Sequence, residues 1–210
     1  MGFLDWFKQD DDASARSGAG SDLDHRLRGL EEESRTAGAG FQWGALNRAG
    51  DLCLRAGDKD RALRYYGRTI DTLLADGQRE AARGVANKII RVHPHAVRTL
   101  CTLTWLDLAA QHQATALLHL RDYVEGAKAA GQEILTARQI VEMARLSPDD
   151  EFLGAAADAL DRLDEPEKAG VVREWARSSG SPDAITDAEE LAEACFDAAI
   201  GSNRTTSGDS

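Results

Sequence analysis

The sequence predicts an all-α protein made of antiparallel helices. Three observations support this fold class. Only 4 of the 210 residues are proline. No stretch alternates apolar and polar residues as a half-buried strand does, whereas apolar residues recur at helical spacing along most of the chain. The breaks between these helical stretches are short, and short connections make neighbouring helices antiparallel.

Residues 1–20 combine apolar and acidic parts. The large apolar side chains of this N-terminal tip are Phe3, Leu4, Trp6 and Phe7, and an acidic run with small residues follows at 10–20. The tip has three possible uses: it folds back onto a groove of its own chain, it binds a partner protein, or it contacts a membrane surface. Anionic lipid would repel the run Asp10 to Asp12, so membrane contact is the least favoured of the three.

The next segment, residues 21–40, predicts a short amphipathic helix and a hinge. Ser21 and Asp24 have the spacing of a capping box, and the apolar stripe is Leu23, Leu27 and Leu30. Glycines at 38 and 40 favour an end to the helix before residue 41.

A helical repeat domain is predicted over residues 41–178. Apolar spacing and Gly or Pro stops predict helices at 41–56, 59–76, 78–92, 96–110, 114–130, 133–146, 150–163 and 166–178. The helix at 96–110 is apolar around most of its circumference, so we expect it at the centre of the array. At one constant offset, Gly77 aligns with Gly131 and Pro94 with Pro148, which indicates an internal duplication of a three-helix unit.

The C-terminal part predicts one more amphipathic helix. Residues 179–201 contain a Ser/Gly/Pro hinge, the capping-box pair Thr186 and Glu189, and an apolar stripe that includes Leu191, Cys195 and Phe196. This helix either caps the last repeat or docks on a partner or a second copy. Residues 202–210 are expected to form a disordered tail.

The stretch from Ala49 to Tyr66 resembles the helix-turn-helix of a tetratricopeptide repeat, as found in helical repeat proteins of bacteria. The residues that carry the structural pattern, including an overlapping second match, are Gly50, Gly57, Ala62, Tyr66, Gly77, Ala82 and Pro94. In that family Gly50 would allow close helix approach, Ala62 would sit at the helix crossing, and Tyr66 would fill the space between helices.

The resemblance implies an α-solenoid, a TPR-like superhelix whose groove binds a peptide or helix of another protein. Family binding residues lie on the first helix of each pair, which makes the groove candidates Asn47, Asp51, Arg55, Arg98 and Trp105. Trp105 suits a binding hot spot, but it suits the core of an apolar helix equally well.

Charge and composition bear on other functions. The net charge of -11 opposes nucleic-acid binding. We expect no metal, no cofactor and no catalytic residues, because the histidines lack metal-ligand spacing and no phosphate loop or nucleophile elbow occurs. Cys53, Cys101 and Cys195 are odd in number and widely spaced, which favours reduced thiols in the cytoplasm.

These patterns predict a cytoplasmic, non-catalytic scaffold or adaptor that binds another protein. One alternative is a self-associating structural protein, a homodimer formed through the C-terminal helix. Another is a peripheral membrane-associated assembly factor that uses the N-terminal aromatic segment.

Overall fold

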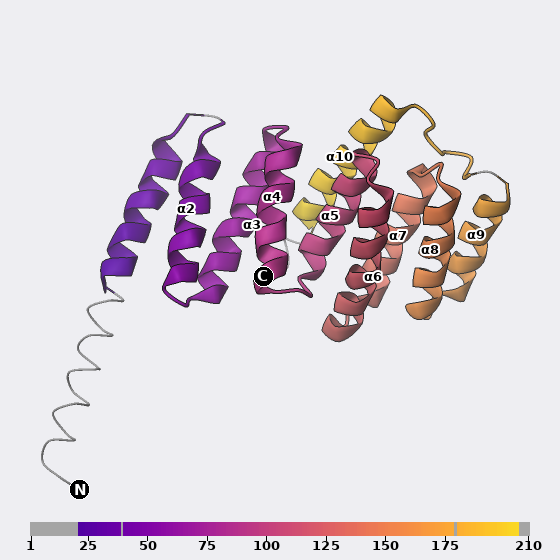
Figure 1. Ribbon diagram of the computed structural model, residues 1–210, viewed down its shortest axis with the longest axis horizontal. Coiled ribbons are helices and arrows are strands. Elements are labelled where there is room, and N and C mark those ends of the chain that lie inside the picture. The colour runs from indigo at the N-terminus through magenta and orange to yellow at the C-terminus, as the bar shows by residue number, and fades with distance from the viewer. Residues whose placement is uncertain (1–20, 39, 179, 206–210) are drawn as a thin grey trace, which may run out of the picture. The chain divides into compact units, whose positions relative to one another are not determined.

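The computed structural model describes residues 21–38, 40–178 and 180–205. Over these residues the chain is helical and contains no strand (Figure 1), which confirms the predicted all-α class. A helix over residues 21–36 is followed by α2 (Gln42–Arg55), α3 (Lys59–Ala75), α4 (Arg79–Val92), α5 (Val97–Ala109), α6 (Gln113–Ala130), α7 (Glu133–Leu146), α8 (Asp150–Arg162), α9 (Pro166–Arg177) and α10 (Ala188–Thr205).

The ends of α2 to α9 lie within one residue of the predicted ends. In contrast, α10 continues to Thr205, beyond the expected end at residue 201. The N-terminal tip and residues 206–210 lie outside the described residues. The chain divides into two compact units, unit 1 over Met1–Thr72 and unit 2 over Leu73–Ser210.

Five of the turns between the described helices share one backbone motif. In each, one residue takes a left-handed conformation, and the next backbone N–H donates to a carbonyl five residues back, as in a Schellman cap. The left-handed residues are Gly57 (φ 79°), Gly77 (φ 71°), Gln111 (φ 54°), Gly131 (φ 67°) and Asp164 (φ 61°). Their hydrogen bonds are Asp58 to Cys53, Gln78 to Leu73, His112 to Asp107, Gln132 to Ala127 and Glu165 to Leu160.

Between α2 and α9, two connections differ from this motif, and each contains a proline. They lie between α4 and α5, at Pro94, and between α7 and α8, at Pro148. The order of connections that follow α2, α3 and α4 is therefore repeated after α5, α6 and α7. After Pro148, the carboxylate of Asp149 caps α8 by accepting the backbone N–H of Phe152 at 2.7 Å.

Unit 1 is built from the helix over 21–36, α2 and the part of α3 up to Thr72. The first helix is fastened to α3 by polar contacts: the Tyr65 hydroxyl donates to Glu31 at 2.7 Å, and Arg61 pairs with Asp24 at 2.5 Å. Leu23 and Leu27, the buried members of its predicted stripe, lie in the interior. Burial and the hydrogen bond to Glu31 raise the pKa of Tyr65 to about 12.

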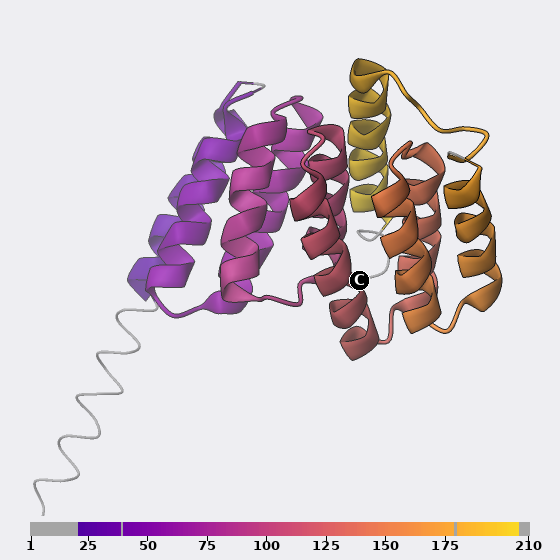
Figure 2. The same cartoon turned by 45° about the vertical axis from the view of Figure 1, so that its right-hand side comes forward.

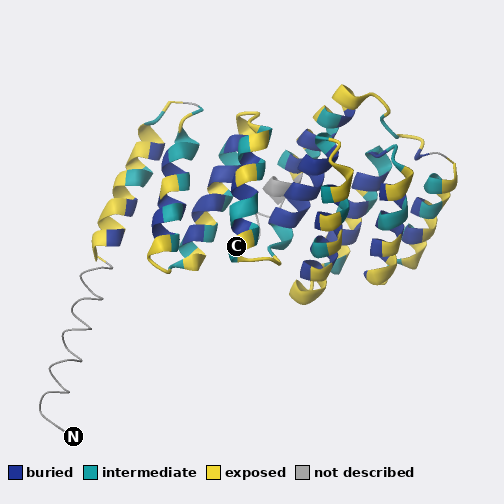
Figure 3. Cartoon of the chain, in the orientation of Figure 1, coloured by how far each residue is buried: buried dark blue, intermediate teal, exposed yellow. Residues whose placement is uncertain are grey.

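Unit 2 is organised around α5. Every residue from Thr99 to Leu108 is buried, in agreement with the central position expected for this apolar helix. The neighbours that enclose it are α4, α6, α7 and α10. Figure 3 shows this helix as the most continuously buried element of unit 2. The helix pair α8 and α9 extends the same core.

The C-terminal helix does not cap the last helix pair. Its main contacts are with α5 and α7 rather than with α8 and α9, and Figures 1 and 2 both show it beside α5. Its predicted stripe is used within the chain, since Leu191, Cys195 and Phe196 are buried, and the Arg79 guanidinium lies 4.5 Å from the centre of the Phe196 ring. A dimer formed through this stripe would require α10 to leave α5.

The thiol of Cys195 offers a probe of this docking. It is fully buried, and burial raises its pKa to about 12, so it stays protonated at pH 8 to 9, where a free thiol near its ordinary pKa would ionise. We expect iodoacetamide at pH 8.5 to label Cys195 at least tenfold more slowly in the native chain than in urea, as read by peptide mass spectrometry. Equal labelling rates in a chain of native helicity would show that α10 does not stay on α5.

A buried charge cluster joins α4, α5 and α6. The carboxylate of Asp107 is fully buried, with Oδ1 2.7 Å from Nη2 of Arg83 and Oδ2 2.6 Å from Nδ1 of His119. Removing one partner from such a cluster leaves other buried polar groups without compensation.

Asp107→Ala should therefore lower the free energy of unfolding by about 3–5 kcal/mol, measured by urea denaturation followed by circular dichroism. The control is Asp158→Ala, whose side chain is 80% exposed and 3.6 Å from Arg173. That change should cost no more than about 0.5 kcal/mol. Similar losses in the two variants would mean that the cluster does not fasten these helices.

Candidate functional site

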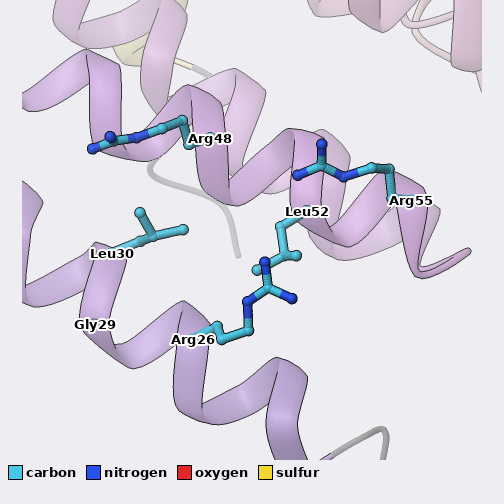
Figure 4. Close-up of a pocket in the computed structure, with 6 residues that line it drawn as sticks. All are labelled: Arg26, Gly29, Leu30, Arg48, Leu52 and Arg55. Atoms are coloured by element: carbon cyan, nitrogen blue, oxygen red, sulfur yellow. The ribbon is translucent and has the colours of Figure 1, made fainter.

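Unit 1 contains a groove lined by three arginines and two leucines. It has a volume of about 370 Å³ and lies between the helix over 21–36 and α2. Its lining residues are Arg26, Gly29, Leu30, Arg48, Leu52 and Arg55. Figure 4 shows Leu52 between Arg55 and Arg26, with Arg26 reaching toward Leu52, and Leu30 on the facing helix toward Arg48. We call this feature the arginine groove.

Helical spacing brings these side chains to one place. Arg48, Leu52 and Arg55 follow one another at four and three residues, so they share one face of α2. Arg26 and Leu30 are four apart on the facing helix. Gly29 lies beside them without a side chain, and a Cβ added there would meet no atom within 4 Å. A side chain introduced at residue 29 would therefore extend into open space at the groove.

Among the described residues, Arg26 and Arg48 form weak, exposed ion pairs. Arg48 pairs with Glu33, with side chains 57% and 53% exposed, and Arg26 lies 3.8 Å from Asp22. No ion pair within the described residues holds Arg55, which ends α2. Exposed pairs of this kind contribute about 0–1 kcal/mol. A carboxylate brought by a ligand can therefore replace Glu33 or Asp22 at little cost.

The opposite side of α2 is locked against α3. Gly50 of α2 faces the ring of Tyr66, and the Tyr66 hydroxyl donates to Oδ1 of Asp51 at 2.6 Å. Burial, and then the hydrogen bond to Asp51, raise the pKa of Tyr66 well above its usual value. Tyr66 is 1% exposed. These contacts fix the rotation of α2 about its axis, and so the direction in which Arg48 and Arg55 point.

The five predicted groove residues are divided between the units. Arg55 lines the arginine groove, while Asn47 is half-buried on α2 and Asp51 bonds to Tyr66. On α5, Arg98 is half-buried and Trp105 is 1% exposed. The Trp105 indole Nε1 donates to Oε1 of Gln139 at 3.2 Å. Trp105 is therefore a core residue, which was the second of the two interpretations that the sequence allowed; the first was a binding hot spot.

The structure places the residues of the repeat-like pattern as follows. Gly50 and Tyr66 meet across α2 and α3, Ala62 and Ala82 are fully buried, and Gly57 and Gly77 form left-handed turns. Pro94 is exposed in the turn after α4.

Sequence reasoning did not nominate Arg26, Gly29, Leu30 or Arg48 as groove residues. The signal that could have found them was the repeated helical spacing of Arg and Leu on two successive helices, with a glycine on one. Isolated arginines on a helix usually cover a solvated face, and only the packing of both helices shows a groove.

Comparisons of this chain with protein-family models, curated proteins and solved structures give no significant match. Among the described residues, no group of three or more His, Cys, Asp or Glu side chains is arranged to hold a metal ion. None of the described helices combines the length and apolar character needed to cross a membrane.

The contact between Gly50 and Tyr66 predicts a sharp difference between two glycines. A Cβ at Gly50 would lie 2.6 Å from Cε1 of the buried Tyr66 ring, whereas a Cβ at Gly67 on α3 would meet nothing within 4 Å. Gly50→Ala should therefore cost about 1–3 kcal/mol by overpacking. Gly67→Ala should raise stability by about 0.5–1 kcal/mol through helix propensity. Thermal denaturation of both variants checks the signs, and a stabilised Gly50→Ala variant would contradict the packing described above.

Proposed function

We propose that the protein is a non-catalytic scaffold or adaptor of the tetratricopeptide-like α-solenoid type. Its arginine groove binds an acidic segment of a partner protein that also carries apolar side chains. The observation that carries this proposal is the set of three guanidinium groups around two leucines in a chain whose net charge is -11. A basic groove in an acidic protein concentrates its attraction for anions at one place.

The chemistry of the groove supports a protein segment as the ligand. Guanidinium groups bind carboxylates in a planar, two-point geometry. Leu30 and Leu52 offer apolar area between the charges, which suits the aliphatic or aromatic side chains of a peptide. A nucleic-acid backbone would bring many phosphates against an acidic surface, and that repulsion disfavours it.

The test measures binding of two fluorescent peptides to the full chain by anisotropy. One contains aspartate and leucine, and the other has asparagine at each aspartate position. We expect the aspartate peptide to bind at least tenfold more tightly, because a hydrogen bond to a charged group contributes about 1.5–3 kcal/mol.

Three variants locate the site. Arg55→Glu reverses one groove charge, and Gly29→Leu fills the groove while every charge stays in place. Both should weaken the aspartate peptide tenfold or more. Arg28→Glu is the matched control, because Arg28 is exposed on the same helix as Arg26 but does not line the groove. If Arg28→Glu weakened binding as much as Arg55→Glu does, binding would be diffuse attraction and the groove would not be its site.

A further inference from the structure

The arginine groove has a candidate occupant in the same chain. Residues 3–12 carry Phe3, Leu4, Trp6 and Phe7, followed by Asp10, Asp11 and Asp12. The groove offers the complementary chemistry, with two leucines and three arginines. The acidic run and the apolar side chains therefore match the two kinds of surface that the groove presents.

The attachment point of this segment lies beside the groove. The first helix begins at residue 21, and Arg26 lies in its second turn, about 8 Å along the helix axis from that start. Residues 13–20 connect Asp12 to the helix and span at most roughly 25–29 Å. Asp10 to Asp12 can therefore reach the arginines without any change in the helices.

The order of residues also fits one direction of binding. Arg26 and Arg55 lie at one end of the groove, and Leu30 and Arg48 lie toward the other (Figure 4). The Arg26 end is the one nearer to residue 21, because Arg26 precedes Leu30 on the first helix. The acidic run is the part of the segment closest to the connection. A segment bound in this direction would bring that run to the Arg26 end and its apolar side chains toward Leu30.

We infer that residues 3–12 occupy the arginine groove of their own chain and compete with an acidic partner segment. This inference rests on the proposed function, because it treats the same groove as a site for acidic segments. A short connection gives an effective concentration on the order of 1 mM. At that concentration a segment with a Kd of about 0.1 mM fills the groove in roughly nine molecules of ten, which weakens a competing ligand about tenfold.

The experiment uses the full chain with Asp10→Asn, Asp11→Asn and Asp12→Asn combined, and the same fluorescent aspartate and leucine peptide. Removing the three carboxylates should tighten peptide binding about tenfold relative to the unchanged chain. The control combines Glu189→Gln, Glu190→Gln and Glu193→Gln, which remove an equal charge from an exposed face of α10. The control should change peptide affinity less than twofold.

The other possible results contradict either the inference alone or both the inference and the proposed function. Equal tightening in both triple variants would show an effect of net charge, and the inference would fall. If the unchanged chain bound the peptide through the groove and the Asp10 to Asp12 variant bound it no better, the inference would fail while the proposed function stood. Absence of peptide binding in every variant would remove both.

A second measurement separates the chain's own segment from that of another copy. Competition within one molecule does not depend on protein concentration, so the apparent peptide affinity should stay constant between dilute and concentrated protein. An affinity that weakens as protein concentration rises would assign the segment to a second copy. A synthetic peptide of residues 1–20 should also displace the fluorescent peptide from the Asp10 to Asp12 variant, and Gly29→Leu added to that variant should abolish its binding.

Discussion

The burial of α5 is the constraint on which unit 2 depends. Its residues from Thr99 to Leu108 are buried on all sides, so one or two neighbouring helices are too few to cover it. The helices adjacent in sequence, α4 and α6, supply part of the cover, and α10 supplies another large part from far along the chain. The same enclosure buries Asp107, and the contacts of its carboxylate with Arg83 and His119 offset the cost of burying this charge. The same packing of helices therefore buries the apolar side chains of α5 and supplies the partners of the Asp107 carboxylate.

In unit 1 the controlling contact is that of Gly50 with Tyr66. Because residue 50 has no side chain, α2 comes close enough to α3 for the aromatic ring to fill the space between them. The hydrogen bond from the Tyr66 hydroxyl to Asp51 fixes the orientation of α2 relative to this ring. One face of α2 therefore packs against α3. The face that carries Arg48 and Arg55 lines the groove with Gly29. The groove is a consequence of how tightly the other side is packed.

Sequence patterns predicted what depends on neighbours along the chain. Apolar periodicity and stops such as Gly57 and Pro94 predicted the ends of α2 to α9 to within one residue, because turn geometry is a local property. The partner of α10 could not be predicted in this way, since its stripe would fit any apolar face. Nor could the groove be predicted, because its lining residues come from two helices whose packing the sequence pattern does not show. The sequence did not decide between a core and a surface position for Trp105, because a helix that is apolar on all sides has no polar face to mark the side exposed to solvent.

Burial divides the charged groups of this protein into two kinds. The buried carboxylate of Asp107 sits where water does not compete, so its contacts with Arg83 and His119 are costly to exchange and serve structure. The arginines of the groove sit in water, and their pairs with Glu33 and Asp22 are exposed and weak. A weak pair that holds an arginine side chain in place without consuming much of its binding energy leaves it ready for another carboxylate. The exposed pairs with Glu33 and Asp22 can therefore be exchanged for another carboxylate at much lower cost than the contacts of Asp107.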